Sequence, residues 1–384
     1  MKRIYLDHNA TTPLHPDVLQ AMLPVLTDCF GNPSSIHSYG RAARVRIDEA
    51  REQVAELIHA RPGEIVFTSG GTEADNFAIL GAGLALKEKG RHVVTCRIEH
   101  PAVLNSCEQL QRLGFAVDYL PVDRQGRVDL NLLQETLTPQ TVLITIQHAN
   151  SEVGTLQDIE KIGELARSRG ILFHTDAVQS VGKIPIDVAA LPVDMLSLSA
   201  HKLYGPKGIG ALYLRQGCPN LFPLISGGGQ EKKRRGGTEH VAGIVGFGKA
   251  SQIAGQRLAL TTIDDMRDRL DKLIRENIPA VQRLGCPRHA LPNTLNLAFE
   301  GADGESMMIA LDMEGIAVST GTACSSGSPM PSHTLSAMQV PVDKINASLR
   351  FSLGWSNAFG EMDTVCRILE KVVRRIREKT PAAM

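Results

Sequence analysis

The chain has 384 residues, too many for one small module, and this length predicts a large domain together with a smaller one. Its 41 basic and 41 acidic residues cancel, which argues against wholesale binding to nucleic acid or to a membrane surface. An apolar fraction of 43%, with no apolar run near the roughly 20 residues of a membrane span, indicates a soluble globular protein.

The segment from about residue 64 to residue 215 alternates short apolar runs with helical stretches, each of which ends at a glycine. Strands that alternate with helices in this way predict a mostly parallel sheet covered on both faces. The expected strands are 64–68, 92–98, 141–146, 171–175, 194–199 and 208–214, and the expected helices are 73–89, 102–113 and 157–169.

The pattern changes after about residue 260, where a charged amphipathic helix begins. We expect a smaller α/β domain formed by residues 259–384 together with residues 1–14, beside a large domain at 15–258. A Gly/Ser-rich loop at about 319–332 interrupts the smaller domain. Its expected elements are a helix at 263–277, a strand at 294–299, a helix at 305–313, a strand at 347–353 and a final basic helix at 361–378.

A glycine turn with the sequence TSGGTE, residues 68–73, joins the first strand to its helix. Exposed N–H groups at such a helix start can bind an anion, and the Ser and Thr hydroxyls add further donors. Gly71 and Thr72 are therefore candidates for a phosphate site. Taken alone, the same residues are more typical of an ordinary helix cap.

Polar side chains follow the later strands of the same expected sheet: His100, Asn150, Asp176 and Lys202. Because parallel α/β sheets bind ligands at the carboxyl ends of their strands, these side chains are expected to meet. Pyridoxal phosphate needs a lysine for its aldehyde, a carboxylate for its pyridinium nitrogen and a cradle for its phosphate. Each residue has a structural explanation by itself, such as a solvated strand end for Lys202. Their combination with the glycine turn predicts a pyridoxal-phosphate site.

Several segments, in order along nearly the whole chain, resemble the signature motifs of cysteine desulfurases. The resemblance is to the nitrogen-fixation and iron–sulfur-cluster-assembly type, within the class V aminotransferase-like pyridoxal-phosphate enzymes. It implies a fold-type I enzyme whose large domain has a mostly parallel seven-stranded sheet. The matching segments are residues 7–13 (DHNATTP), 68–73 (TSGGTE), 99–100 (EH), 174–179 (HTDAVQ), 199–208 (SAHKLYGPKG), 234–238 (RRGGT), 320–326 (TGTACSS) and 347–354 (ASLRFSLG).

The resemblance implies a role for each matching residue. Lys202 would bond the cofactor and carry the α-proton, Asp176 would pair with the ring nitrogen, and His100 would stack on the ring and move protons. Gln179 would contact the ring hydroxyl, and the phosphate would be bound by Gly71, Thr72, Ser199 and His201. In a homodimer, Thr238 would contact the phosphate of the second subunit. Asn150 would lie beside cofactor and substrate, and Arg350 would bind the substrate carboxylate.

Cys324 has the strongest claim to chemistry among the seven cysteines. It lies in the Gly/Ser-rich loop, where a thiol could collect sulfur in the pocket and pass it on to an acceptor. From spacing alone, it could also be a surface thiol without a function. No pair has CxxC spacing, so neither a disulfide framework nor a metal site is expected, and a reducing cytoplasm fits. The other cysteines lie in apolar periodic segments (Cys96, Cys107, Cys366) or beside Gly or Pro turns (Cys29, Cys218, Cys286).

The expected activity is conversion of L-cysteine to L-alanine, with the sulfur held on Cys324 as a persulfide and then passed to an acceptor such as an iron–sulfur scaffold protein. A selenocysteine or cystine lyase of the same fold is the alternative enzyme, and a persulfide-relaying scaffold without chemistry of its own is the alternative of another class. The MKRIYLDHNATTP start lacks the apolar stretch of a secretory signal, and a cytoplasmic protein is expected.

Overall fold

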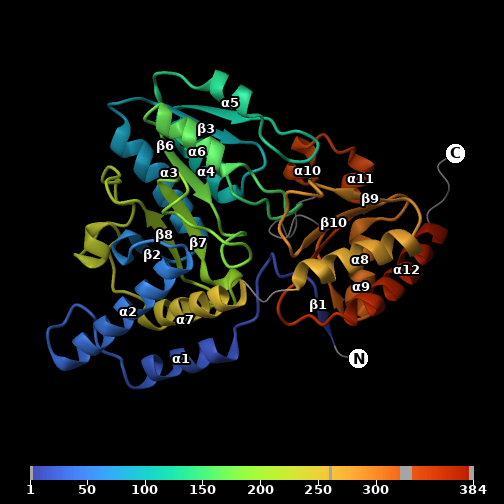
Figure 1. Cartoon of the computed structure of the whole chain (residues 1–384), viewed down its shortest axis with the longest axis horizontal. Coiled ribbons are helices and arrows are strands. Elements are labelled where there is room, and N and C mark those ends of the chain that lie inside the picture. The colour runs from blue at the N-terminus through green and yellow to red at the C-terminus, as the bar shows by residue number, and fades with distance from the viewer. Residues whose placement is uncertain (1–2, 259–261, 321–330, 380–384) are drawn as a thin grey trace.

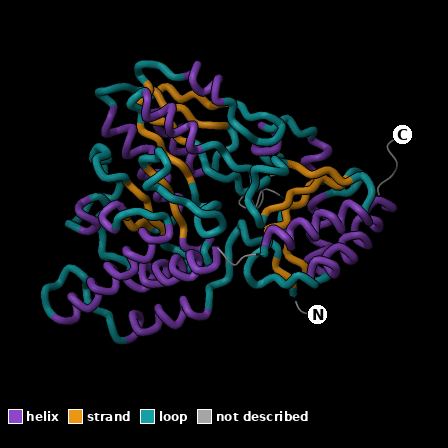
Figure 2. Tube along the Cα trace, in the orientation of Figure 1, coloured by secondary structure: helices purple, strands orange, loops and turns teal. Residues whose placement is uncertain are grey.

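The structure is a computed structural model that describes residues 3–258, 262–320 and 331–379. A seven-stranded sheet with helices on both faces forms the larger region, and the chain then builds a smaller region beside it (Figures 1 and 2). No helix in these described stretches is long and apolar enough to cross a membrane.

The seven-stranded sheet has the order β2-β8-β7-β6-β5-β3-β4. Only β8 runs against its neighbours, β2 and β7, so the expected mostly parallel sheet is confirmed. Its edge strand β4 was not predicted, because two of its five residues are exposed and its apolar run is weak. The strands are β2 (Ile65–Thr68), β3 (His92–Cys96), β4 (Ala116–Leu120), β5 (Thr141–Thr145), β6 (Leu172–Asp176), β7 (Met195–Ser199) and β8 (Gly210–Leu214).

Alternate residues of the central strands face two different apolar clusters, which is why nearly every residue of these strands is buried. In β3, Val93 packs into the cluster beneath α3 and α4, whereas Val94 packs into the cluster beneath α2, α6 and α7. The helices of this region are α1 (Pro16–Thr27), α2 (Ser38–Leu57), α3 (Gly71–Leu86), α4 (Pro101–Arg112), α5 (Leu130–Thr136), α6 (Ile159–Ser168) and α7 (Val241–Leu258).

The smaller region has a three-stranded antiparallel sheet, β12-β10-β9, and a short parallel pair, β1-β11. Ile4 and Leu6 of the N-terminal segment belong to its apolar cluster, together with side chains of α8, α9 and α12. Its elements are β1 (Ile4–Tyr5), α8 (Ile263–Asn277), β9 (Val281–Leu284), β10 (Thr294–Phe299), α9 (Gly304–Met313), β11 (Ile316–Ala317), α10 (His333–Ala337), α11 (Val342–Asn346), β12 (Ser348–Ser352) and α12 (Glu361–Lys379).

The N-terminal segment crosses from the smaller region to the larger one (Figure 1). Asp7 forms a bridge with Ser352 in β12, and five residues later the N–H of Thr12 donates to the carbonyl of His201 at 3.0 Å. The intervening residues therefore lie between β12 and the turn that follows β7, and this position brings them to the candidate site.

Candidate active site

Lys202 lies at the end of a short 3-10 helix, Ala200–Lys202, that directly follows β7. Its amine donates to the backbone carbonyls of Asn9 at 2.5 Å and Ala10 at 2.8 Å. The N-terminal segment thus holds the lysine on the sheet's carboxyl edge.

Asp176 is the last residue of β6, next to β7 in the sheet. Its Oδ1 accepts the N–H of Val178 at 2.9 Å, which fixes the carboxyl in the turn after the strand. Burial raises the pKa of Asp176, whereas the nearby charges of His100 and Lys202 lower it. Three of the four side chains predicted to meet at the strand ends, those of Asp176, His100 and Lys202, are therefore close enough to interact electrostatically.

His100 precedes α4, and its Nδ1 accepts the N–H of Ala102 at 3.1 Å. In the neutral imidazole the proton therefore sits on Nε2. Burial lowers the pKa of His100, Asp176 opposes this shift, and Lys202 and His333 add to it. Since the ordinary value is already near 6.5, His100 is a neutral side chain with one N–H available at neutral pH.

The start of α3 lies against the turn after β6 and the end of β7. A Cβ built on Gly71 would be 2.8 Å from Cγ2 of Val178 and 3.6 Å from the Cβ of Ser199, so only glycine fits at this helix start. Thr72 is exposed on the first turn, whereas Ser199 is buried. The helix N-terminus, the Thr72 hydroxyl and the Ser199 hydroxyl form the kind of cradle that suits a phosphate.

His201 lies beside this cradle, and its Nδ1 is 3.1 Å from the hydroxyl of Thr11. Burial, together with Lys202 and Lys207, lowers the pKa of His201 to about 4. The imidazole is therefore neutral at physiological pH. It can offer a phosphate one hydrogen bond but no positive charge.

Asn150 and Gln179 reach the same region, and both amides already have protein partners. Oδ1 of Asn150 accepts the N–H groups of Glu152 at 2.9 Å and Val153 at 3.0 Å, and its Nδ2 donates to Ile98. Nε2 of Gln179 donates to the carbonyl of Asn9 at 3.0 Å. Each amide keeps a second N–H, so the ligand-binding roles expected for them use only that remaining donor.

Arg350 is buried in the middle of β12, with 2% of its surface exposed. Its Nη2 donates to Oδ1 of Asp7 at 2.6 Å and its Nη1 donates to the carbonyl of Ser151 at 3.1 Å. Its backbone pairs with Ser319, which lies two positions before residues 321–330. Cys324 falls outside the described residues, but the chain enters its segment from beside Arg350.

Thr238 is exposed and lines a hollow of about 240 Å³ together with Ser69 and Arg235. Arg235 forms an ion pair with Glu73 at 2.9 Å, which links this loop to the first turn of α3. The expected contact of Thr238 with a second subunit stays a prediction.

Four of the six described cysteines are poor candidates for sulfur transfer. Burial raises the pKa of Cys107 and Cys218 to about 12 and that of Cys366 to about 11, so these thiols stay protonated. The Sγ of Cys96 is buried and donates to Glu99 at 2.8 Å. A thiolate is the reactive form, so none of these four positions suits a nucleophile.

Asn9, Lys183 and Glu99 are site residues that sequence reasoning missed. The only available signal for Asn9 was its place in the DHNATTP segment, and for Glu99 its position before His100. Glu99 is fully buried, its Oε1 accepts the N–H of Gln147 at 2.8 Å, and burial raises its pKa to about 8.

A mostly parallel α/β sheet with a lysine, an aspartate and a glycine-initiated helix at its carboxyl edge defines an enzyme of the pyridoxal-phosphate fold. The chain belongs to the aminotransferase class-V family, whose sequence model matches residues 4–365, and within it to the group that contains the cysteine desulfurases.

The relatives confirm the resemblance inferred from the motifs. Cysteine desulfurase IscS of Dictyoglomus turgidum is 48% identical over 99% of this chain and 97% of its own length. Cysteine desulfurase IscS of Methanosarcina thermophila is 46% identical over 99% and 94%. A solved NifS-like protein superposes with a TM-score of 0.91 at 36% identity, covering 97% of this chain and 100% of its own. SspA in complex with cysteine gives 0.82 at 40% identity, with 91% and 98% covered.

Proposed function

We propose that this chain is a pyridoxal-phosphate-dependent cysteine desulfurase that converts L-cysteine to L-alanine and transfers the sulfur to its own Cys324. The observation that carries the proposal is the convergence of Lys202, Asp176 and His100 at one edge of the sheet. Full-length relatives named cysteine desulfurase and a structural neighbour solved with cysteine support the substrate.

The residues present fit pyridoxal phosphate. Lys202 offers the amine and Asp176 the carboxylate for the ring nitrogen. The cradle at Gly71 is too tight for a Cβ without a shift of Val178, and it lies at a helix start, where the first N–H groups have no partner within the helix. When bound, the cofactor supplies an electron sink for the bond-breaking steps on the substrate. The raised pKa of Asp176 reflects a buried carboxylate that lacks a full counterion, and a protonated ring nitrogen would provide one.

Arg350 is the proposed anchor for the substrate carboxylate. Its planar fork can hold a carboxylate bidentately, and its Nε is buried without a partner among the described residues. His100, neutral with its proton on Nε2, can donate that proton and then accept one. The amine of Lys202 would be a second base at the same edge.

Sulfur transfer requires Cys324 as a thiolate. Its sulfur bonds to the sulfur of the substrate, the bond between that sulfur and the substrate Cβ breaks, and the electron pair stays with the carbon. A proton then takes the place of sulfur on the carbon, so the substrate leaves as alanine and the enzyme keeps a persulfide. At an ordinary thiol pKa of about 8.5 only a small fraction is thiolate at neutral pH, so the nearby bases must assist.

The persulfide would pass to an acceptor protein, with an iron–sulfur scaffold as the proposed recipient. A homodimer in which Thr238 completes the phosphate site of the partner is part of the proposal. A fully active monomer in sedimentation and kinetic assays would contradict the dimer but not the chemistry.

The test follows alanine release from L-cysteine, together with mass spectrometry of the Cys324 peptide, in the pyridoxal-phosphate-loaded protein. The wild type and a Cys29→Ser control should release alanine and carry one extra sulfur on that peptide. Lys202→Ala should lose the absorption band of lysine-bound cofactor. Sulfur transfer to an acceptor by Cys324→Ser without added thiol would overturn the assignment, and a Cys324→Ala variant as active as wild type would point to the selenocysteine or cystine lyase.

A further inference from the structure

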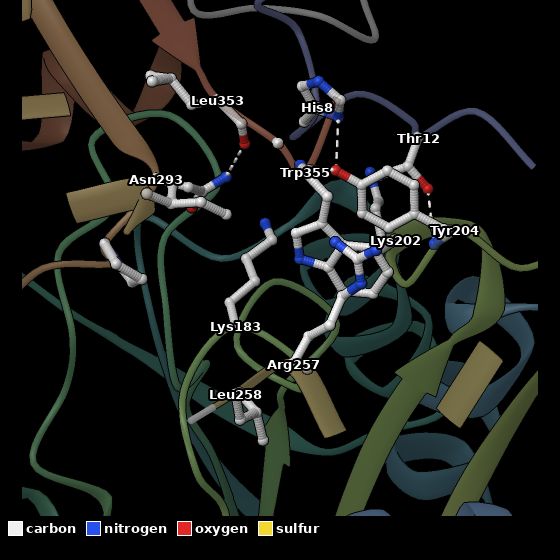
Figure 3. A pocket seen from close by; sticks show the side chains of 14 residues that line it. His8, Thr12, Lys183, Lys202, Tyr204, Arg257, Leu258, Asn293, Leu353 and Trp355 are labelled. Carbon is white, nitrogen blue, oxygen red and sulfur yellow. Dashed lines mark hydrogen bonds between the residues drawn. The ribbon is translucent and has the colours of Figure 1, made fainter. Parts of the chain in front are cut away.

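Lys183 is a second lysine at the site, and the proposed reaction gives it no task. It follows the glycine turn after β6, and its amine donates to Oδ1 of Asn9 at 2.9 Å and to Oε1 of Gln179 at 2.8 Å. Figure 3 shows it beside Lys202 on a cavity of about 30 Å³, which has room for water but not for a cofactor.

Asn9 connects the two lysines. Its side-chain oxygen accepts from Lys183, and its backbone carbonyl accepts from Lys202 at 2.5 Å and from Gln179 at 3.0 Å. The Asn9 amide cannot turn over, because its Nδ2 donates to the carbonyl of Ser151 at 3.0 Å and to the hydroxyl of Thr294 at 2.8 Å. Asn9 is 1% exposed, so water cannot replace these partners.

The charged groups around Lys183 are basic. Burial lowers the pKa of Lys183 well below its ordinary value, and Lys202 and Arg350 lower it further. His8 and Arg257 line the same cavity, and its described lining includes no acidic residue. The nearby carboxylates serve other cations: Asp7 pairs with Arg350, and Asp176 acts on Lys202 and His100.

The amine of Lys183 donates to two acceptors, Oδ1 of Asn9 and Oε1 of Gln179. One of them, Oε1 of Gln179, fixes which end of that amide faces Asn9. Gln179 therefore presents its remaining N–H in one orientation, where the resemblance places the ring hydroxyl of the cofactor.

We infer that Lys183 is a positioning residue: its amine fixes the Gln179 amide in one orientation and ties it to Asn9, whose backbone carbonyl holds the amine of Lys202. The inference rests on the proposed function, since the aligned groups are those that would hold the cofactor. It assigns Lys183 no contact with substrate.

Two variants of the pyridoxal-phosphate-loaded enzyme test it. Lys183→Met keeps the stem but removes both donors. Oδ1 of Asn9 still accepts from Nδ2 of Asn293 at 3.0 Å, but Oε1 of Gln179 is left unpaired, which should speed cofactor dissociation and lower kcat by about tenfold each, with KM little changed. Lys183→Arg places a permanent cation beside Lys202, so the pH midpoint of the lysine-bound cofactor's absorption band should fall by about one unit. Lys161→Met, at an exposed lysine paired with Asp158, is the control and should change neither.

Lys183→Met within twofold of the control in both dissociation and kcat would overturn the inference. If that variant fails to fold in a thermal unfolding test, Lys183→Arg alone tests the inference. A pH midpoint of the absorption band equal to that of wild type would then contradict the placement of Lys183 beside Lys202. A wild type without the absorption band would contradict the proposed function itself, whereas a normal wild type with normal variants would contradict only the role of Lys183.

Discussion

Arg350 and Asp7 form an ion pair with 2.6 Å between Nη2 and Oδ1, although 343 positions separate them in the chain. The guanidinium is 2% exposed, whereas the carboxylate is 20% exposed. Asp7 thus occupies one side of the group proposed to bind the substrate carboxylate. It serves as the counterion of a buried cation while the substrate is away.

Asp7→Asn should therefore destabilise the substrate-free protein. Breaking a fully buried ion pair costs about 3–5 kcal/mol, and the partial exposure of Asp7 reduces the expected loss to about 1–3 kcal/mol. Alanine, the proposed product, carries a carboxylate that can restore a counterion to Arg350. It should accordingly raise the melting temperature of the variant more than that of the wild type in thermal unfolding. Equal shifts in the two proteins would show that Arg350 does not bind the carboxylate.

Asp176→Asn should lower turnover without lowering the stability of the cofactor-free protein. Asparagine keeps an oxygen that can accept the N–H of Val178, but it removes the charge of a buried carboxylate. The desolvation of that charge is what raises the pKa of Asp176. The cofactor-free variant should then be at least as stable as wild type in urea unfolding. Alanine release by the loaded variant should fall by about 100-fold or more, because the ring nitrogen loses its charged partner. A variant with unchanged turnover would contradict the role of Asp176.

The fold was predictable where local sequence decides it. Strands 141–145 and 195–199 lie within the expected runs and are buried throughout, and the helix at 263–277 has the expected bounds. Helix α3 begins at Gly71 rather than Glu73, because the glycine is already helical. Helices α1, α2 and α7 and strand β4 were not predicted; they pack on other helices or lie at a sheet edge, where the apolar pattern is less regular.

The candidate site could also be predicted only in part, at the residues that local sequence places. Asp176 ends β6 and Lys202 lies three positions after the end of β7, so the strand pattern alone placed them on one edge. Asn9 could not be found in this manner, because its link to Lys202 spans 193 positions and depends on how the N-terminal segment crosses the fold. The contact between Lys183 and Asn9 could not be predicted either, since 174 positions separate the two residues.

Glu99 should make the stability of the protein pH-dependent. Burial raises its pKa to about 8, from 4.5 in the unfolded chain, so between these values the folded state binds the extra proton. The contribution of Glu99 to stability therefore falls as the pH rises through that window. Glu99→Gln cannot ionise, so its stability relative to wild type should grow by up to about 3 kcal/mol between pH 5 and pH 7, at 1.36 kcal/mol per pH unit. Urea unfolding at pH 5, 6 and 7 measures the difference, and a constant difference would show that Glu99 ionises normally.

Gly71→Ala should weaken the cofactor cradle without unfolding the protein. The new Cβ would lie 2.8 Å from Cγ2 of Val178, so the start of α3 must shift away from the turn that holds Asp176. Misplaced phosphate contacts should cost about 1.4 kcal/mol of binding free energy. We therefore expect about a tenfold loss in pyridoxal-phosphate affinity. Gly255→Ala is the matched control: its Cβ meets only Leu57 at 3.7 Å, so it should stabilise α7 by about 0.5–1 kcal/mol and leave affinity unchanged. Fluorescence titration of the cofactor-free proteins measures both affinities, and equal affinities would mean that the phosphate binds elsewhere.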